Sequence, residues 1–381
     1  RCNELASQAL RRTPSATSLE DWATRQGCPG RCRRSVPIAL VLFGLLPWND
    51  ERRPKLSFAY RLVAHAIVVV AMSVFFLMHF GYIFTEGCET RDWLCTRPGF
   101  FSQLSLPAGA ILVLAMGSSK RHREALEDAL SMVLGVSFER RYQNWHMRLA
   151  RRDKAFFVVI AVCYVVAAAL WDLLAEETGR AHVAARLSVQ VPMMSLFGGI
   201  ILCMAYGLVH ICRSLCIMID AFCCDVLRLG SPERVSHVWN LTQAVLRKAS
   251  VSVEHFLLLL CLILAFMLPL LLVDLGVVGS ENANVFVTLP AVCVTVGILY
   301  MLLLAAMISE KCSRVPALIN AISFGEGTEV ARQQTVDFIS NSAAGFYVFG
   351  MRLTAGVVLK LIYIWCIVVV GLLTRVGATG G

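Results

Sequence analysis

Charged residues are scarce in this chain. Asp, Glu, Lys and Arg make up 16% of its 381 residues, against about a quarter in an ordinary soluble domain, while apolar residues make up 57%. This surplus of apolar surface needs lipid around it rather than a larger core. The composition therefore excludes an ordinary soluble domain and favours a membrane protein.

Catalytic and nucleic-acid-binding patterns are also missing. The chain has no phosphate-cradling glycine motif, no His-Glu-x-x-His and no nucleophile elbow, and its eight histidines share no ligand spacing. The net charge of +9 comes from basic residues that border apolar stretches instead of forming one patch. We therefore expect no enzyme, no metal, no cofactor and no nucleic-acid partner.

Seven apolar stretches dominate the sequence. Each is about 18–24 residues long, enough to cross a hydrocarbon core roughly 30 Å thick as a helix rising about 1.5 Å per residue. The only charged residues inside them are Asp172, Asp274 and Lys360. The stretches are Leu62–Phe84, Gly99–Met116, Phe156–Leu174, Val189–Ile211, Phe256–Val278, Val285–Ile308 and Leu353–Leu373. The fold class predicted is all-α, a polytopic membrane protein with seven transmembrane helices.

Lys and Arg are sorted to one side of these spans. Of the 35 in the chain, 29 lie before the first span or in the second, fourth and sixth connections, and 5 lie in the other connections and the tail. Because basic connections stay in the cytoplasm, the N-terminus is predicted inside and the C-terminus outside.

One polytopic domain is expected. Residues 1–35 are predicted to be a disordered cytoplasmic tail, and residues 36–56 an interfacial apolar segment (Val36–Trp48) with a basic linker. Residues 57–375 hold the seven helices, with amphipathic helices such as Arg121–Leu134 and Val235–Leu246 in the long inner connections. The outer connections are short, so any extracellular ligand must enter among the helices. The first residue is Arg, so we expect sequence to be missing before it.

The fifteen cysteines do not form a disulfide framework. Five of them lie in the spans, where free Cys behaves as a small apolar residue. Only Cys88 and Cys95 lie in a predicted extracellular connection, where they could form a bridge or remain free thiols.

The charges at membrane depth mark candidate functional positions. Asp172 and Asp274 lie near the outer ends of their spans, where they either reach headgroup water or line an outward-facing vestibule with Trp171 and Tyr164. Lys360 lies seven residues into the last span, about 10 Å deep at helical rise. Its ammonium group either borders a water-filled path or pairs with a carboxylate on another helix.

The order of these features resembles the gustatory receptors of arthropods. That family has a short apolar segment ending in Gly-Leu-x-Pro before the first span, and here Phe43–Pro47 reads Phe-Gly-Leu-Leu-Pro. Ala344–Phe346, followed by Arg352 and Leu353, is similar to the lead-in to the family's last span.

The family's signature in the last span is Thr-Tyr, five apolar residues and Gln-Phe. Tyr363 matches its Tyr, Ile362 stands in place of Thr, and Val369 and Val370 replace Gln-Phe. The chain is thus similar to a divergent member, and an unusual charge, Lys360, lies beside the signature.

The resemblance implies a taste receptor that acts as a ligand-gated cation channel in the plasma membrane of a chemosensory neuron. It would be a homo- or hetero-tetramer with related receptors, in contact with membrane lipid, that binds a small-molecule tastant among the outer halves of the middle helices. Its last helices would line the pore, with Lys360, Tyr363, Cys366, Val369 and Val370 as pore and gate candidates. The pocket candidates are Tyr164, Trp171, Asp172 and Asp274.

Three alternatives remain open. A G-protein-coupled receptor needs an outside N-terminus, an Asn-Pro in the last span and an Asp/Glu-Arg-Tyr after the third, none of which is found. A transporter would show matching halves, and the prolines in the spans do not reveal them. An odorant-receptor-like channel of the same inverted topology fits the same pattern.

Overall fold

The computed structural model describes residues 63, 65–71, 73–74, 100–135, 140–174, 180–278 and 285–379. The expected tail 1–35, the interfacial segment 36–56 and the Cys88–Cys95 pair lie outside this part of the chain. The described residues are almost entirely helical, as the sequence predicts for a polytopic membrane protein.

Eight helices and one β-hairpin follow from residue 100 onward within the described ranges. Their bounds are α5 Phe100–Ser118, α6 Lys120–Gly135, α7 Arg140–Leu174, α8 Arg180–Leu229, α9 Pro232–Val278, α10 Val285–Asn320, α11 Glu329–Asn341, β1 Tyr347–Val348, β2 Met351–Arg352 and α12 Ala355–Thr379.

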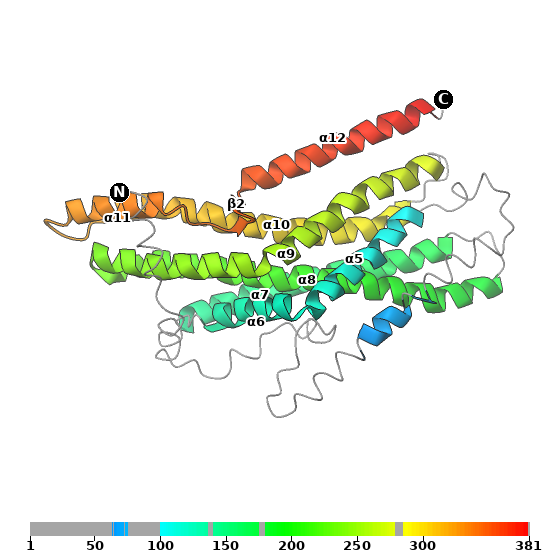
Figure 1. Ribbon diagram of the computed structural model, residues 1–381, viewed down its shortest axis with the longest axis horizontal. Helices are drawn as coiled ribbons and strands as arrows, with labels where there is room; N and C mark the ends of the chain where they lie inside the picture. Colours follow the sequence, from blue (N-terminus) through cyan, green and yellow to red (C-terminus); the bar gives the residue numbers. More distant parts are fainter. Residues whose placement is uncertain are drawn as a thin grey trace.

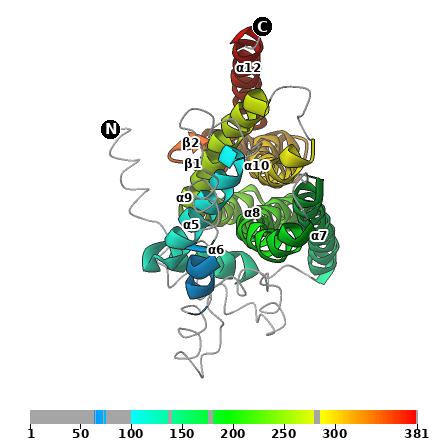
Figure 2. The same ribbon diagram turned by 90° about the vertical axis from the view of Figure 1, so that its right-hand side faces the viewer.

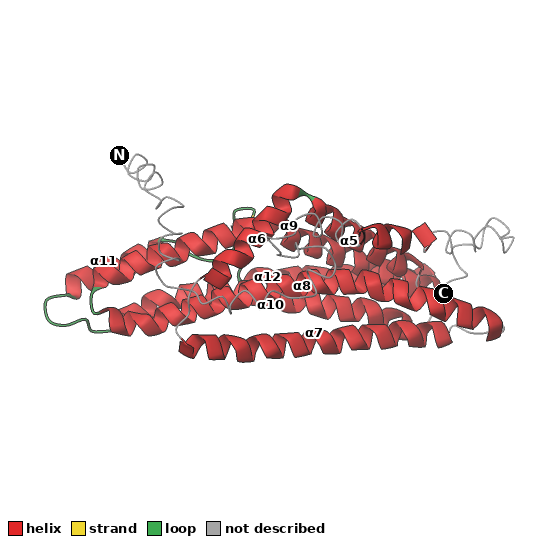
Figure 3. Ribbon diagram, turned by 90° about the horizontal axis from the view of Figure 1, so that it is seen from below, coloured by secondary structure: helices red, strands yellow, loops and turns green. Residues whose placement is uncertain are grey.

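Several helices are much longer than a membrane is thick. The 50 residues of α8 span about 75 Å at helical rise, more than twice a hydrocarbon core of roughly 30 Å. These long helices run side by side along an elongated bundle (Figure 1; Figure 3). The predicted amphipathic run Val235–Leu246 and the predicted span Phe256–Val278 are parts of the same helix, α9.

A two-residue break separates α8 from α9. Gly230 has a φ of 67°, a conformation that costs an L side chain energy, and Pro232 opens the next helix, where its missing N–H leaves no hydrogen bond unmade. The turn brings α9 back along α8, so that both contribute to one core.

The centre of the bundle is α8, which α5, α7, α9 and α10 surround (Figure 2). Its side chains Phe197, Ile200, Ile201 and Met204 are completely buried. Because α8 is apolar on nearly all sides, it can serve as the core for helices packed on several faces.

Four helical segments among the described residues are long and apolar enough to cross a membrane: Arg148–Leu170, Gln190–Val226, Pro232–Met267 and Leu289–Asn320. Ser105–Ser118 and Ala355–Val368 are shorter apolar helices. From Phe100 onward, the described residues of each predicted span are helical, except Leu353 and Thr354, which precede α12. The first predicted span lies largely outside the described residues, so the count of seven stays a prediction.

Helix α12 leaves the bundle after the hairpin, and its C-terminal half projects away from the other helices (Figure 1). Val358 near its start is buried, and Leu361, Ile362 and Trp365 pack partly against the core. Apart from the half-buried Ala355, the other described apolar side chains of α12 are exposed.

Candidate functional site

Tyr164 is the best-defined of the predicted pocket residues. It lies on α7, is 1% exposed, and its hydroxyl donates to the carbonyl oxygen of Met194 on α8 at 2.9 Å. Its ring lies directly over Gly198, where an added Cβ would come within 2.7 Å of Cε1. The small residue allows the two helices to approach, and Tyr164 joins them with both its ring and its hydroxyl.

The other three pocket candidates are placed by their backbone alone. Trp171 and Asp172 lie in the last turn of α7, and Asp274 lies near the end of α9. Their side chains are outside the described part of the structure, so no contact with Tyr164 is assigned to them.

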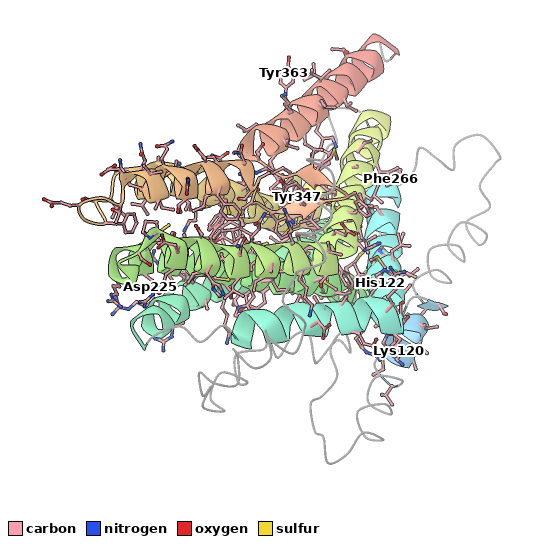
Figure 4. The ribbon with its side chains drawn as sticks, turned by 60° about the vertical axis from the view of Figure 1, so that its left-hand side comes forward. Lys120, His122, Asp225, Phe266, Tyr347 and Tyr363 are labelled. Atoms are coloured by element: carbon pink, nitrogen blue, oxygen red, sulfur yellow. The ribbon has the colours of Figure 1, made fainter. Side chains whose placement is uncertain are left out.

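Four of the five pore and gate candidates lie on faces of α12 that the chain itself leaves uncovered. Lys360 and Cys366 are exposed, and Tyr363 is 67% exposed and points away from the other helices (Figure 4). Val370 is exposed as well, while the side chain of Val369 is not described. No ion pair joins Lys360 to the described residues.

Ser309 on α10 holds both ends of the hairpin that precedes α12. The Phe346 N–H donates to Ser309 Oγ at 3.0 Å, and Arg352 Nη2 donates to the Ser309 carbonyl oxygen at 3.0 Å. Gly345 fits closely here, since an added Cβ would lie 2.7 Å from Arg352 Nε. The lead-in residues that resemble the gustatory receptors thus fasten α10 to the start of α12.

The tip of the hairpin is fastened to α9. Phe349 and Gly350 have φ angles of 49° and 78°, the pattern of a type I′ turn, which is unfavourable for a residue as bulky as Phe. The Phe349 N–H donates to Glu254 Oε2 at 3.1 Å, and its ring lies 5.4 Å from the ring of His255. These contacts hold the turn in its strained conformation.

A second histidine extends this contact to α6. The His122 and His255 rings are 5.0 Å apart, and His122 also lies against Phe256. Burial, and then the electrostatic effects of His255 and of the Arg121 guanidinium, lower the pKa of His122 below its ordinary value of 6.5. A row of contacts therefore runs from α6 through α9 to the hairpin and α12.

An ion-pair cluster buried among α7, α8 and α10 was missed by sequence reasoning. Arg213 donates to both oxygens of Asp153 at 2.9 Å and to the Tyr300 hydroxyl at 2.8 Å, and that hydroxyl donates to Asp153 Oδ1 at 2.6 Å. Asp153 is 3% exposed. One signal in the sequence could have revealed Asp153. It lies four positions before Phe157 and eleven before Tyr164, and these helical spacings place all three residues on the buried face of α7.

Solved structures with this fold exist. The insect olfactory receptor OR5 from Machilis hrabei in complex with eugenol is similar over 94% of this chain and 98% of its own, with a TM-score of 0.58 and 12% identity. The same receptor in a second structure matches with a TM-score of 0.54 and 10% identity, over 90% of this chain and 98% of its own.

Sequence comparison adds no further relative, since no protein-family model and no curated protein matches the chain. At such low identities the structural likeness shows the fold. The chain therefore shares the fold of this insect olfactory receptor over 94% of its length.

Proposed function

We propose that the chain is a subunit of a chemosensory receptor that works as a ligand-gated cation channel. The observation that carries this proposal is the fold shared with OR5 over 94% of the chain and 98% of the receptor. Because OR5 was solved with eugenol, a small organic ligand is the expected stimulus here as well. Such a receptor makes and breaks no covalent bond and needs no cofactor.

The proposed topology has seven spans, with the N-terminus inside and the C-terminus outside. The 29-to-5 division of Lys and Arg between alternate connections supports it. It places α11 and the inner ends of α8 and α9 in the cytoplasm of a plasma membrane. The Asn240-Leu-Thr sequon would then stay without glycan, and a glycosylated Asn240 would overturn the topology.

The proposed pore forms where the last helices of four subunits meet, in a homotetramer or with related receptors. The exposed faces of α12, which carry Tyr363, Cys366 and Val370, support this role because the chain itself does not cover them. Apolar side chains around such a pore can gate it by excluding water, and Lys360 would face the ion path.

The proposed ligand site lies among the outer halves of the middle helices, where Tyr164 joins α7 to α8. A ligand opens the channel only if it binds the open state more tightly than the closed one. Shifts of α7 and α8 would pass to α10, and through Ser309 to the hairpin and α12.

Two kinds of stimulus compete within this proposal. The sequence motifs of the last span resemble gustatory receptors, which favours a tastant, whereas the solved structures described above are of an olfactory receptor. Panels of sugars, bitter compounds and volatile aromatics, applied to the same channel, would separate taste from odour.

The decisive experiment expresses the full chain in oocytes, applies these panels and records currents while G-protein signalling is blocked. We expect a cation current that persists under the block and whose ion selectivity changes in Lys360→Glu. A response abolished by the block would favour the G-protein-coupled alternative. An unchanged selectivity in Lys360→Glu at normal surface expression would remove Lys360 from the pore.

A further inference from the structure

One face of α7 changes abruptly from basic to apolar along its length. Arg148, Arg151, Arg152 and Lys154 are exposed, and after Ala155 the same face continues with exposed valines. The valines are Val158, Val159, Val162, Val165 and Val166. At 3.6 residues per turn these nine positions fall on one side of the helix, which we call the α7 strip.

The opposite face of α7 is closed by protein. Phe157, Ile160 and Tyr164 are buried there, and the helix packs on that side against α8 and α10. In two views α7 lies at the edge of the bundle (Figure 2; Figure 3). The strip is therefore the side of α7 that faces outward in the single chain.

The one acidic residue in this segment does not reduce the charge of the strip. Asp153 points to the buried face, where both of its oxygens accept hydrogen bonds from Arg213 and one accepts a further bond from Tyr300. Among the described residues, none of the four basic side chains of the strip has an acidic partner. Four cations thus remain free to attract anions.

The two parts of the strip match the two parts of one ligand. Exposed valines suit acyl chains, and a cluster of Arg and Lys just below them suits phosphate oxygens at the headgroup level. A soluble partner protein would be expected to cover the basic part alone, whereas a phospholipid covers both parts at the observed transition near Ala155.

We propose that the α7 strip is a binding site for an anionic phospholipid of the cytoplasmic leaflet, with a multiply charged headgroup of the phosphoinositide class. The proposal rests on the inside placement of these basic residues given above, and it does not depend on channel activity. Bound lipid would fix the depth of α7 at the level of the Asp153–Arg213–Tyr300 cluster.

The test measures lipid binding to the purified full chain in detergent. The probe is phosphatidylinositol 4,5-bisphosphate with a fluorescent acyl chain, read by anisotropy, with phosphatidylcholine carrying the same label as comparison. In Arg151→Gln/Arg152→Gln we expect affinity for the anionic lipid to fall about tenfold or more, because each cation near the headgroup contributes to attraction. Affinity for phosphatidylcholine should not change.

A matched control removes the same charge elsewhere. Arg228 and Arg234 are exposed at the turn between α8 and α9, roughly 22 Å beyond Arg213 along α8 at helical rise. Arg228→Gln/Arg234→Gln should leave lipid affinity within about twofold of the native chain if attraction is confined to charges near the headgroup. Unchanged melting temperatures would show that both double variants are folded.

Three results would overturn the proposal. The first is that Arg151→Gln/Arg152→Gln binds the anionic lipid as tightly as the native chain, and the second is that the control variant loses as much affinity for this lipid as Arg151→Gln/Arg152→Gln. The third is that soluble inositol 1,4,5-trisphosphate displaces the labelled lipid at the same concentration as the unlabelled lipid does. The last result would mean that the valines contribute nothing. Because binding is measured without currents, failure here leaves the proposed channel function untouched.

Discussion

Helices α8 and α12 are both strongly apolar in sequence, but α8 is mostly buried inside the chain and α12 is mostly exposed. In the most apolar part of α8, 83% of the residues are buried inside the molecule, whereas most described side chains of α12 are exposed. Apolar character therefore serves internal packing in α8 and contacts outside the chain in α12. Substitutions in and around α8 should change stability, while substitutions in α12 should change assembly and current.

The largest expected loss of stability comes from the buried cluster around α8. Asp153→Leu leaves the Arg213 guanidinium buried without its carboxylate, and breaking such a pair costs about 3–5 kcal/mol. We expect a markedly lower melting temperature for the detergent-purified chain, measured by intrinsic tryptophan fluorescence.

The control for this effect is the double variant Asp153→Leu/Arg213→Met. Removing both charges leaves no unpaired ion, so stability should return close to the native value. If Asp153→Leu melts at the native temperature, the carboxylate does not hold these helices together. If the double variant is no more stable than Asp153→Leu, lost packing and not an unpaired charge explains the loss of stability.

The next largest effect is expected at Gly198, under the ring of Tyr164. Gly198→Ala places a methyl group where the ring lies, so that Tyr164 must move and loses its hydrogen bond to Met194. Overpacking of this kind costs about 1–3 kcal/mol. The same substitution on α12 is the matched control, since a Cβ at Gly371 would meet no atom of the described residues within 4 Å.

The two glycine variants should have different effects on the melting temperature, which Gly198→Ala should lower and Gly371→Ala should not. Gly371→Ala should leave the melting temperature unchanged or raise it slightly, because alanine favours helix by up to about 1 kcal/mol. Equal losses of stability in the two variants would contradict the conclusion that α8 is packed inside the chain and α12 is not. Combining Gly198→Ala with Tyr164→Ala should recover part of the loss if the clash is with the ring.

The sequence was enough to predict the helices that the structure shows over the apolar stretches from Phe100 onward. A run of 18 or more apolar residues has few ways to satisfy its backbone in lipid other than a helix, and this holds whatever the neighbours are. Helical inner connections could also be predicted, since Val235–Leu246 shows the spacing of an amphipathic helix and lies within α9.

The contacts of the candidate site could not be predicted, because they join residues far apart in the chain. Asp153 stands among Arg151, Arg152 and Lys154, so its pairing with Arg213 is hidden by nearer cations. Phe349 and Glu254 are separated by 95 positions. Local spacing identifies which face of a helix is buried but not which helix covers it.

A smaller effect is expected at His122, which links α6 to the base of α12 through His255 and Phe349. Its lowered pKa means that the packed arrangement binds fewer protons than one with His122 in water. The contact is therefore fully stable above pH 6.5, the ordinary value, and weakens as the pH falls below it. Glu254 of α9 and Arg121 of α6 are the other charged groups that face this pair.

The measurement compares melting at about pH 7.5 and about pH 5.5, a range over which histidine changes its charge. We expect the native chain to lose more stability on acidification than His122→Asn does. His237→Asn, at an exposed position of α9, should behave like the native chain. The same pH dependence in His122→Asn and the native chain would show that this contact is not sensitive to protons.

The smallest effect on stability is expected at Tyr363. This position distinguishes most clearly between side chains that pack inside the chain and side chains that make contacts outside it. Its side chain is 67% exposed, so Tyr363→Ala should change the free energy of unfolding by no more than about 0.5 kcal/mol. Trp365, two residues further along α12, packs partly against the core, and Trp365→Ala should lower the melting temperature. Tyr363→Ala should instead reduce the ligand-gated current, or the tetramer detected by cross-linking, at normal surface expression. If Tyr363→Ala destabilises the chain as much as Trp365→Ala, α12 is held by its own subunit and cannot be the element that four subunits share.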